Sequence, residues 1–358
     1  MSKIQIWQGG AFETAISMEA PYLPPKVLCL KQNNVATTEF LSAIRQLCTR
    51  VITNNEKFVI RDGSKHPRIQ GYTDYSKFEY ISTAAAVVLT AEYERVAKLN
   101  NETPPTAELH KWSEEVFRKL YQLGFFEVVG HVPKRKDVII DFGATRTMQI
   151  ISTENNDDLD RIDRSLQELG EFLNPDKNIP EEILVEILTA ISEAISNVKH
   201  HAYPADYPLA YPHLNRLWVA ATANRDKNTL TIVVYDQGAT IPVTYPRMSR
   251  RDRVRTFLQR AIRPETDFEY QNDGTYIRAA MRYGGSRTEK EYRGRGLPQM
   301  IEVLTRIGLG QMSVYSRGGW CSQSSNGRLT SGANGFSIGG TLIEWTLELP
   351  LIRSVVTV

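Results

Sequence analysis

The stretch EAISNVKHHAY, residues 193–203, ends the most regular helical pattern of the chain and decides the expected fold. Apolar residues recur along residues 180–201 at the spacing of a single buried stripe, which predicts one helix over that range. Glu193, Asn197 and His201 follow one another at intervals of four residues and therefore share one helix face. Such a polar row is either a solvent-exposed face or one wall of a polar site.

A second informative stretch is LTIVVYDQG, residues 230–238, where an apolar strand ends at an acid and a glycine. A carboxylate at the end of a strand, here Asp236, can accept a hydrogen bond from an amine on a ligand. Gly238, two positions on, allows the backbone to approach that ligand closely. The alternative is an ordinary turn of the Asp-x-Gly type.

Two further glycine segments follow along the chain. Gly294 and Gly296 precede a helix that is predicted to begin near Leu297 and to end at Gly308. The free amides and the dipole at such a helix start form an anion site. The last segment, GGTLIEWTLEL over residues 339–349, places Thr341 at the start of an alternating strand, a pattern that is also typical of a plain edge hairpin.

In this order, the four segments resemble the GHKL ATPase superfamily, named for gyrase, a heat-shock chaperone, histidine kinases and MutL. The N box of that superfamily looks like residues 193–203, and its three glycine boxes look like residues 236–242, 294–297 and 340–341. The resemblance covers residues 150–350 and implies a Bergerat-type α/β sandwich with a mixed sheet that helices cover on one face. It also implies that the chain binds ATP together with Mg2+.

The resemblance assigns a role to each matching residue. Glu193 would polarise the attacking water as a general base, and Asn197 would coordinate the Mg2+ that bridges the ATP phosphates. Asp236 would accept the adenine amino group, with Thr341 behind it. Gly238 would line the base, and Gly294, Gly296 and Leu297 would lie around the phosphates and the lid hinge. Within the lid interval, Arg287 and Arg295 are the expected phosphate contacts.

This chain departs from the superfamily pattern in the region that would close over the nucleotide. Thr240 stands where the first glycine box has its second glycine, and Pro298 follows the second box. The interval 243–293 is long, and its part between Arg247 and Arg263 holds seven arginines and one acid. This run is either a solvated helix face or a lid surface for phosphates or an acidic partner.

Length and composition limit the remaining options. A chain of 358 residues corresponds to about two domains, and we expect an N-terminal domain over 1–135 and the ATP-binding domain over 136–358. A hydrophobic fraction of 41% without a long uncharged apolar run predicts a protein that does not span a membrane. The net charge of +2 gives no global nucleic-acid footprint, and three widely spaced cysteines suit the reducing cytoplasm.

The N-terminal part carries a weaker pattern. Residues 75–89, YSKFEYISTAAAVVL, form a strand that leads into a helix of small residues, and they resemble STAS-type modules. The resemblance implies a smaller α/β interaction domain; a helical α/β domain without this kinship is the alternative. A protein partner would bind through this domain or through the arginine-rich lid, and homodimerisation stays open.

The sequence therefore predicts a Mg2+-dependent ATP-binding enzyme, a slow ATPase whose nucleotide state drives a conformational or assembly switch. One alternative is a protein serine kinase of the anti-sigma-factor type that acts on a separate STAS-like partner. Another is a nucleotide-sensing scaffold without catalysis, against which the Glu193 carboxylate argues, because binding alone does not need it. A histidine kinase is not expected, since the surroundings of His110 lack the H-E-x-x-x-P pattern.

Overall fold

The centre of the molecule is an eight-stranded sheet in the order β14-β13-β12-β15-β11-β10-β8, with β9 also paired to β10. The computed structural model describes residues 3–8, 11–17, 23–61, 67–130, 132–133, 143–154, 158–175, 179–205, 208–248, 252–262, 268–284 and 296–349. The strands of the central sheet are β8 (Thr145–Thr147), β9 (Ile151–Thr153), β10 (Leu217–Asn224), β11 (Thr229–Asp236), β12 (Gly310–Ser316), β13 (Gly319–Ser324), β14 (Leu329–Ala333) and β15 (Thr341–Glu348).

Every strand pairing that the described residues form in this sheet is antiparallel, so the expectation of a mixed sheet is wrong. The cause lies in the connections. β10 and β11, β12 and β13, and β13 and β14 follow each other across short turns, and strands joined in this way run in opposite directions. The pairing of β11 with β15 places Asp236 directly opposite Thr341 at one end of the sheet.

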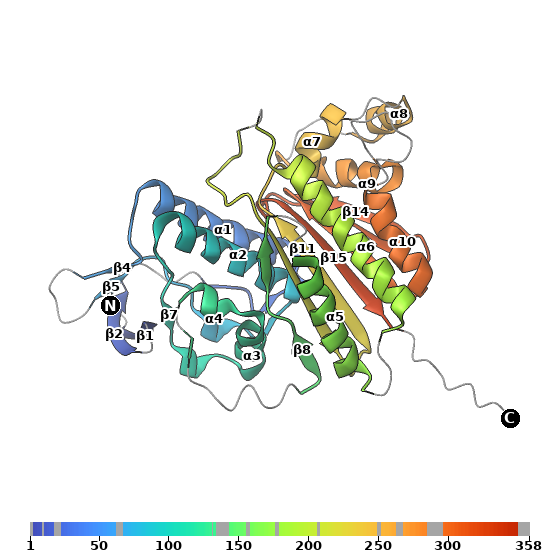
Figure 1. The fold of residues 1–358 in the computed structure, drawn as a ribbon. Helices are drawn as coiled ribbons and strands as arrows, with labels where there is room; N and C mark the ends of the chain where they lie inside the picture. The colour runs from blue at the N-terminus through green and yellow to red at the C-terminus, as the bar shows by residue number, and fades with distance from the viewer. Residues whose placement is uncertain are drawn as a thin grey trace.

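Helices α5 (Leu159–Leu173), α6 (Glu181–Asn197) and α10 (Leu297–Ile307) cover one face of the sheet (Figure 1). Side chains at alternate strand positions, among them Ile232 and Val234 of β11, form one core with these helices. The helix predicted over 180–201 is confirmed as α6, which continues into a short π-helical turn over Val198–Ala202. The helix predicted between Leu297 and Gly308 is confirmed as α10.

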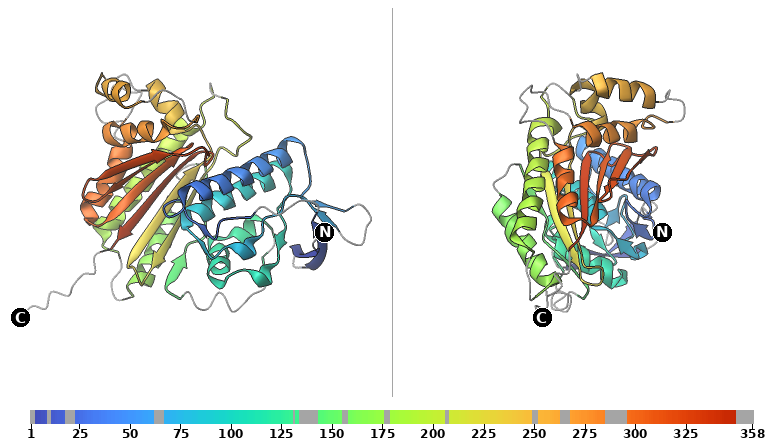
Figure 2. Two further views of the ribbon diagram at one scale, coloured as in Figure 1. Left: turned by 180° about the vertical axis from the view of Figure 1, so that it is seen from behind. Right: turned by 90° about the vertical axis from the view of Figure 1, so that its right-hand side faces the viewer.

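The opposite face is covered by α1 (Asn34–Thr53) and α2 (Thr83–Asn100), two helices of the N-terminal part (Figure 2). Strand residues of the other parity, such as Trp218 and Tyr235, share a second core with these helices, α3 (Glu114–Leu123) and α4 (Phe125–Val128). The physical reason is that α2 has no exposed side over most of its length, because every residue from 83 to 96 is buried. A helix that is buried all round needs a layer on each side.

The remaining N-terminal elements form two small sheets, in the orders β4-β5-β2-β1-β7 and β3-β6. The predicted domain boundary at residues 135 and 136 lies outside the described residues and stays a prediction, although the core that α2 shares with β10 and β11 joins the two parts. The elements are β1 (Lys3–Gln8), β2 (Ala11–Ser17), β3 (Val27–Leu28), β4 (Val59–Ile60), β5 (Arg68–Ile69), β6 (Tyr80–Ile81), β7 (Thr106–Ala107), and the 3-10 turns η1 (Tyr75–Lys77) and η2 (Leu109–Lys111).

The interval 243–293, which contains the arginine run and is called the arginine-rich interval below, is described in part. Its described residues are mostly helical, in α7 (Ile241–Met248), α8 (Asp252–Ala261) and α9 (Asp273–Tyr283). A small core of Tyr245, Val254, Ala279 and Ala280 holds these three helices together. In the described ranges, none of the helices combines the length and the apolar character that a membrane crossing requires. The layers confirm the expected α/β class.

Candidate functional site

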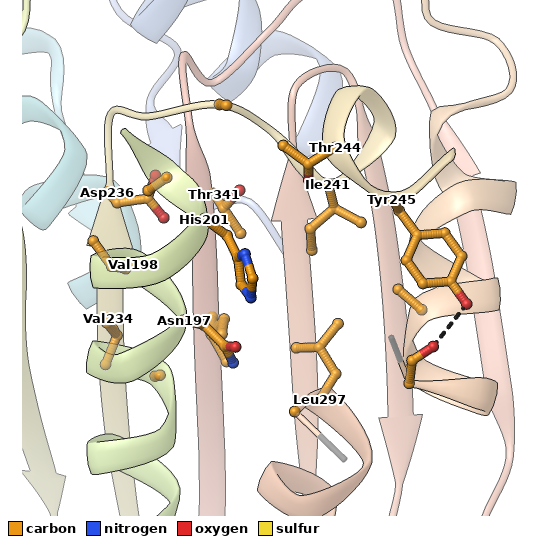
Figure 3. A pocket seen from close by; sticks show the side chains of 17 residues that line it. Asn197, Val198, His201, Val234, Asp236, Ile241, Thr244, Tyr245, Leu297 and Thr341 are labelled. Atoms are coloured by element: carbon orange, nitrogen blue, oxygen red, sulfur yellow. Dashed lines mark hydrogen bonds between the residues drawn. The ribbon is translucent and has the colours of Figure 1, made fainter. Parts of the chain in front are cut away.

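A pocket opens between the C-terminal end of α6 and the edge of the sheet where β11 ends and β15 begins (Figure 3). We call it the central pocket. Helix α7 and the start of α10 close its other sides. It is lined by Ala194, Asn197, Val198, His201, Ala202, Val234, Asp236, Ala239, Ile241, Thr244, Tyr245, Ala280, Gly284, Gly296, Leu297, Thr341 and Ile343.

Asp236 is the charged residue at the sheet end of the central pocket. It has the same strand parity as Val234, so its side chain points to the face that α6 covers. Its Oδ1 accepts a hydrogen bond from the backbone N–H of Gly238 over 2.8 Å, and the backbone N–H of Thr341 also donates to it. Burial raises the pKa of Asp236 from 3.8 to about 7, and the two amide donors act against that rise. The carboxyl lines the pocket, where its oxygen atoms can accept a further hydrogen bond from a donor group on a ligand.

Thr341 is fixed by a hydrogen bond between two hydroxyl groups. Its Oγ1 lies 2.8 Å from Oγ of Ser316 on β12, and that oxygen also accepts from the backbone N–H of Ile241 over 2.9 Å. Ser316 is fully buried. The end of the sheet is thereby joined to the start of α7, which fixes the wall of the central pocket opposite α6.

Gly238 has a structural reason of its own. A Cβ atom there would lie 2.2 Å from the carbonyl oxygen of Ala202, because the backbone after Asp236 packs directly against the end of α6. The neighbouring N–H of Ala239 donates to the same carbonyl over 2.6 Å. Gly238 does not line the central pocket, in contrast to what the superfamily pattern implies, but its lack of a side chain allows Asp236 and α6 to approach each other.

Asn197 and His201 enter the central pocket from α6 and its π-helical turn. Figure 3 shows both side chains on the pocket side, and Asp236 and Thr341 line the same pocket. π-helical turns occur frequently at functional sites. The sequence placed His201 on the face of Asn197, but the irregular turn that carries it leaves no sequence signal.

Glu193 lies outside the central pocket. It is half-buried in a neighbouring depression on the surface of α6, together with Val185, Leu188 and Gln299. Burial raises the pKa of Glu193, and the nearby His200 acts in the opposite direction. The residue one helical turn later, Asn197, and the residue next to Glu193, Ala194, do line the central pocket. Glu193 therefore borders the pocket without facing into it.

The start of α10 forms the end of the central pocket away from Asp236. Gly296 caps this helix with a φ of +42°, and both Gly296 and Leu297 line the pocket. A Cβ atom on Gly296 would lie 3.8 Å from the Asn197 side-chain nitrogen, so these two segments face each other. Arg287, Gly294 and Arg295 lie outside the described residues.

Sequence reasoning missed the wall that α7 and α9 contribute. Ile241, Thr244, Tyr245 and Ala280 line the central pocket there. The Tyr245 hydroxyl donates to the carbonyls of Ala279 over 3.2 Å and Gly284 over 2.9 Å, which anchors α7 to α9. Ile241 lies within the stretch 236–242 that resembles the first glycine box, but nothing in the local pattern marks Thr244, Tyr245 or Ala280, because their place in the pocket depends on how α7 packs against α9.

The donor set allows one kind of metal site. Among the described residues, no three His, Cys, Asp or Glu side chains group in a way that would hold a metal ion. Mg2+ commonly keeps several waters and takes one or two protein oxygens plus substrate phosphates. The amide oxygen of Asn197 in the central pocket fits that mode, with a phosphate ligand supplying the other oxygens.

No protein-family model matches the chain, and no curated protein matches it either. The chemistry of the central pocket therefore rests on its own residues. A buried carboxyl, an amide on a helix wall and a helix start converge on one apolar cavity.

Proposed function

We propose that the central pocket binds ATP with Mg2+, and that the protein is a slow ATPase whose nucleotide state drives a conformational or assembly switch. The observation that carries the proposal is the convergence of Asp236, Asn197 and the start of α10 on one pocket. These three features are far apart in the sequence, and each suits a different part of a nucleotide.

The sheet end of the pocket suits a purine base with an exocyclic amine. Asp236 is buried and holds a carboxyl that two backbone amides orient. The apolar side chains of Val198, Val234 and Ile343 supply walls for a flat ring, and the His201 ring offers a stacking surface. A base with an amine donor at Asp236 is adenine and not guanine, whose corresponding position is a carbonyl.

The helix end of the pocket suits phosphates. The amides at the start of α10 and its dipole favour negative charge, and Gly296 leaves its backbone open to close approach. Asn197 faces this start and would supply an oxygen ligand to Mg2+, whose chemistry when bound is to neutralise phosphate charge. The residue that holds the ion thus lies between the base end and the phosphate end.

Hydrolysis requires a base that can accept a proton from water. Glu193 is the carboxylate one turn before Asn197 on α6, and burial raises its pKa, which makes it a stronger base than a fully solvated carboxylate. It lies in the depression next to the central pocket, beside Ala194, which lines the pocket. We assign it the role of general base on these grounds.

The test is a binding and turnover experiment on the full chain. Titration with ATP is expected to show binding that strengthens when Mg2+ is present, and incubation with ATP is expected to release inorganic phosphate slowly. No binding of ATP in the presence of Mg2+ would overturn the proposal. Binding with transfer of labelled phosphate to a co-purified protein would replace the ATPase by a serine kinase, and binding without turnover would leave a nucleotide-sensing scaffold.

A further inference from the structure

We propose that Glu92 and Gln237 form a positioning pair, through which the N-terminal helices hold the base end of the central pocket in shape. The inference rests on the proposed function for its ligand, but the contacts that carry it belong to the protein alone. Neither residue lines the central pocket. Gln237 is the residue next to Asp236, and Glu92 lies on α2 on the opposite face of the sheet.

The pair connects the two faces of the sheet through one peptide unit. Asp236 points into the pocket, whereas the side chain of Gln237, which is 1% exposed, points toward α2. Its Nε2 donates to Oε1 of Glu92 over 3.2 Å. A movement of Gln237 would carry the backbone of Asp236 with it, and with it the carboxyl that we assign to the base.

Glu92 is itself fixed by a buried ion pair. Its Oε2 accepts from Nη2 of Arg95 over 2.6 Å and from Nε over 3.1 Å, and both side chains are fully buried. Arg95 also donates to the Thr49 hydroxyl on α1 over 3.2 Å and to the Pro212 carbonyl over 2.9 Å. The ion pair restricts the Glu92 carboxylate to this position, because moving it away would leave two buried charges unpaired.

The segment that leads into β15, the other strand at the base end of the pocket, is also held by the N-terminal helices. Arg45 of α1 donates through Nη2 to the Ser337 carbonyl, in the loop that leads to Thr341. Arg45 occupies the space where a side chain on Gly339 would be: a Cβ there would lie 2.1 Å from Nη1, and the φ of Gly339 is +83°. Helices α1 and α2 therefore fix both segments that bring Asp236 opposite Thr341.

The competing explanation is that these contacts only attach the helices to the sheet. A matched contact tests it. Thr83, at the other end of α2, donates to the Thr222 hydroxyl on β10 over 2.8 Å, and both residues are buried. Thr83→Val breaks this bond in the same interface, away from the central pocket. Gln237→Met keeps the length of the side chain and removes its donor, which leaves Oε1 of Glu92 without that hydrogen bond.

The experiment compares the two variants with the wild type in three measurements: the midpoint of thermal unfolding, hydrogen exchange without ligand, and affinity for a non-hydrolysable ATP analogue with Mg2+. We expect both variants to lower the midpoint. Only Gln237→Met should speed exchange at residues 236–241 and 338–341 and weaken the analogue, by about tenfold. Thr83→Val should leave exchange at these residues and the affinity unchanged.

Two results would overturn the positioning pair. One is unchanged ligand-free exchange at residues 236–241 in Gln237→Met. The other is an equal loss of affinity in both variants, which would show that interface stability alone matters. If the wild type itself binds no nucleotide, the proposed function fails, while the ligand-free exchange still decides whether Glu92 and Gln237 shape the pocket.

Discussion

Two buried carboxylates lie on opposite faces of the central sheet, and their surroundings differ. Glu92, on the face that α1 and α2 cover, pairs with the guanidinium of Arg95. Asp236, on the face that α6 covers, accepts hydrogen bonds from two backbone amides, and burial raises its pKa to about 7. A buried carboxylate that forms an ion pair has a structural role, because its charge is already neutralised. A carboxyl that is held by backbone amides in a cavity can still accept a hydrogen bond from a ligand. The comparison separates the structural face of the sheet from the binding face.

The largest effect is expected on the binding face, beside the pocket. Glu193→Ala should lower phosphate release about 10²- to 10⁴-fold, because general-base assistance is typically worth that much, while ATP affinity stays near that of the wild type. The measurement is a phosphate-release assay alongside a binding titration. Glu182→Ala, an exposed carboxylate in the first turn of the same helix, is the matched control and should change neither. Wild-type turnover in Glu193→Ala would remove the role that we give this residue.

The next largest effect is expected in the pH dependence of stability, through the raised pKa of Asp236. The folded-state pKa of Asp236 is raised from 3.8 to about 7, so the folded protein holds this proton where the unfolded chain has lost it. The stability that this proton contributes is present at low pH and is lost as pH rises toward 7. A tenfold difference in proton affinity between the folded and unfolded states corresponds to about 1.4 kcal/mol, so the loss amounts to a few kcal/mol at most.

The measurement is the free energy of unfolding without nucleotide, from about pH 5 to about pH 8. Asp236→Asn cannot titrate at this position, and we expect its stability to rise relative to the wild type as pH increases. If the free energies of unfolding of the two proteins change in parallel with pH, the pKa of Asp236 is not raised by burial in the folded protein, and the account of this carboxyl is wrong.

The pocket was predictable from the sequence where its chemistry is local. The strand before Asp236 is apolar and ends at an acid, and the helix before Asn197 has one apolar stripe, so both residues were placed correctly on their elements. Gly296, Leu297 and Thr341 also line the pocket, and the nucleotide contacts expected of them stay predictions. Glu193 was expected on the same face as Asn197, and the side chain instead occupies the neighbouring depression.

The second layer of helices was missed, although the sequence held a signal for it. Residues 83–96 offer almost no polar side, and a helix of that kind is buried on every side. The partner of Gln237 could not be predicted, because Glu92 lies 145 residues away and meets it only when α2 packs on the sheet. The mixed sheet was wrong for a different reason: three of its strand pairs are joined by short turns, which make the paired strands antiparallel.

The smallest effect is expected in the arginine-rich interval, which borders the binding face. Helix α9 packs against β13 and β14, so its amides should be protected from hydrogen exchange with and without nucleotide. Helix α8 meets the rest through few buried side chains, Val254 among them, and we expect a modest gain in its protection when Mg2+ and an ATP analogue are added. Equal protection of α8 in both states would show a permanently folded surface helix and not a lid.

The central claim is that Asp236 recognises the base of ATP, and calorimetric titration tests it most directly. The wild type, Asp236→Ala and the exposed control Asp226→Ala are each titrated with ATP and with GTP. We predict that the wild type and the control bind ATP in preference to GTP. We predict that Asp236→Ala loses ATP affinity by about 1–3 kcal/mol, because the amine of the bound base is left without its acceptor. Wild-type affinity for ATP and wild-type preference over GTP in Asp236→Ala would contradict the account.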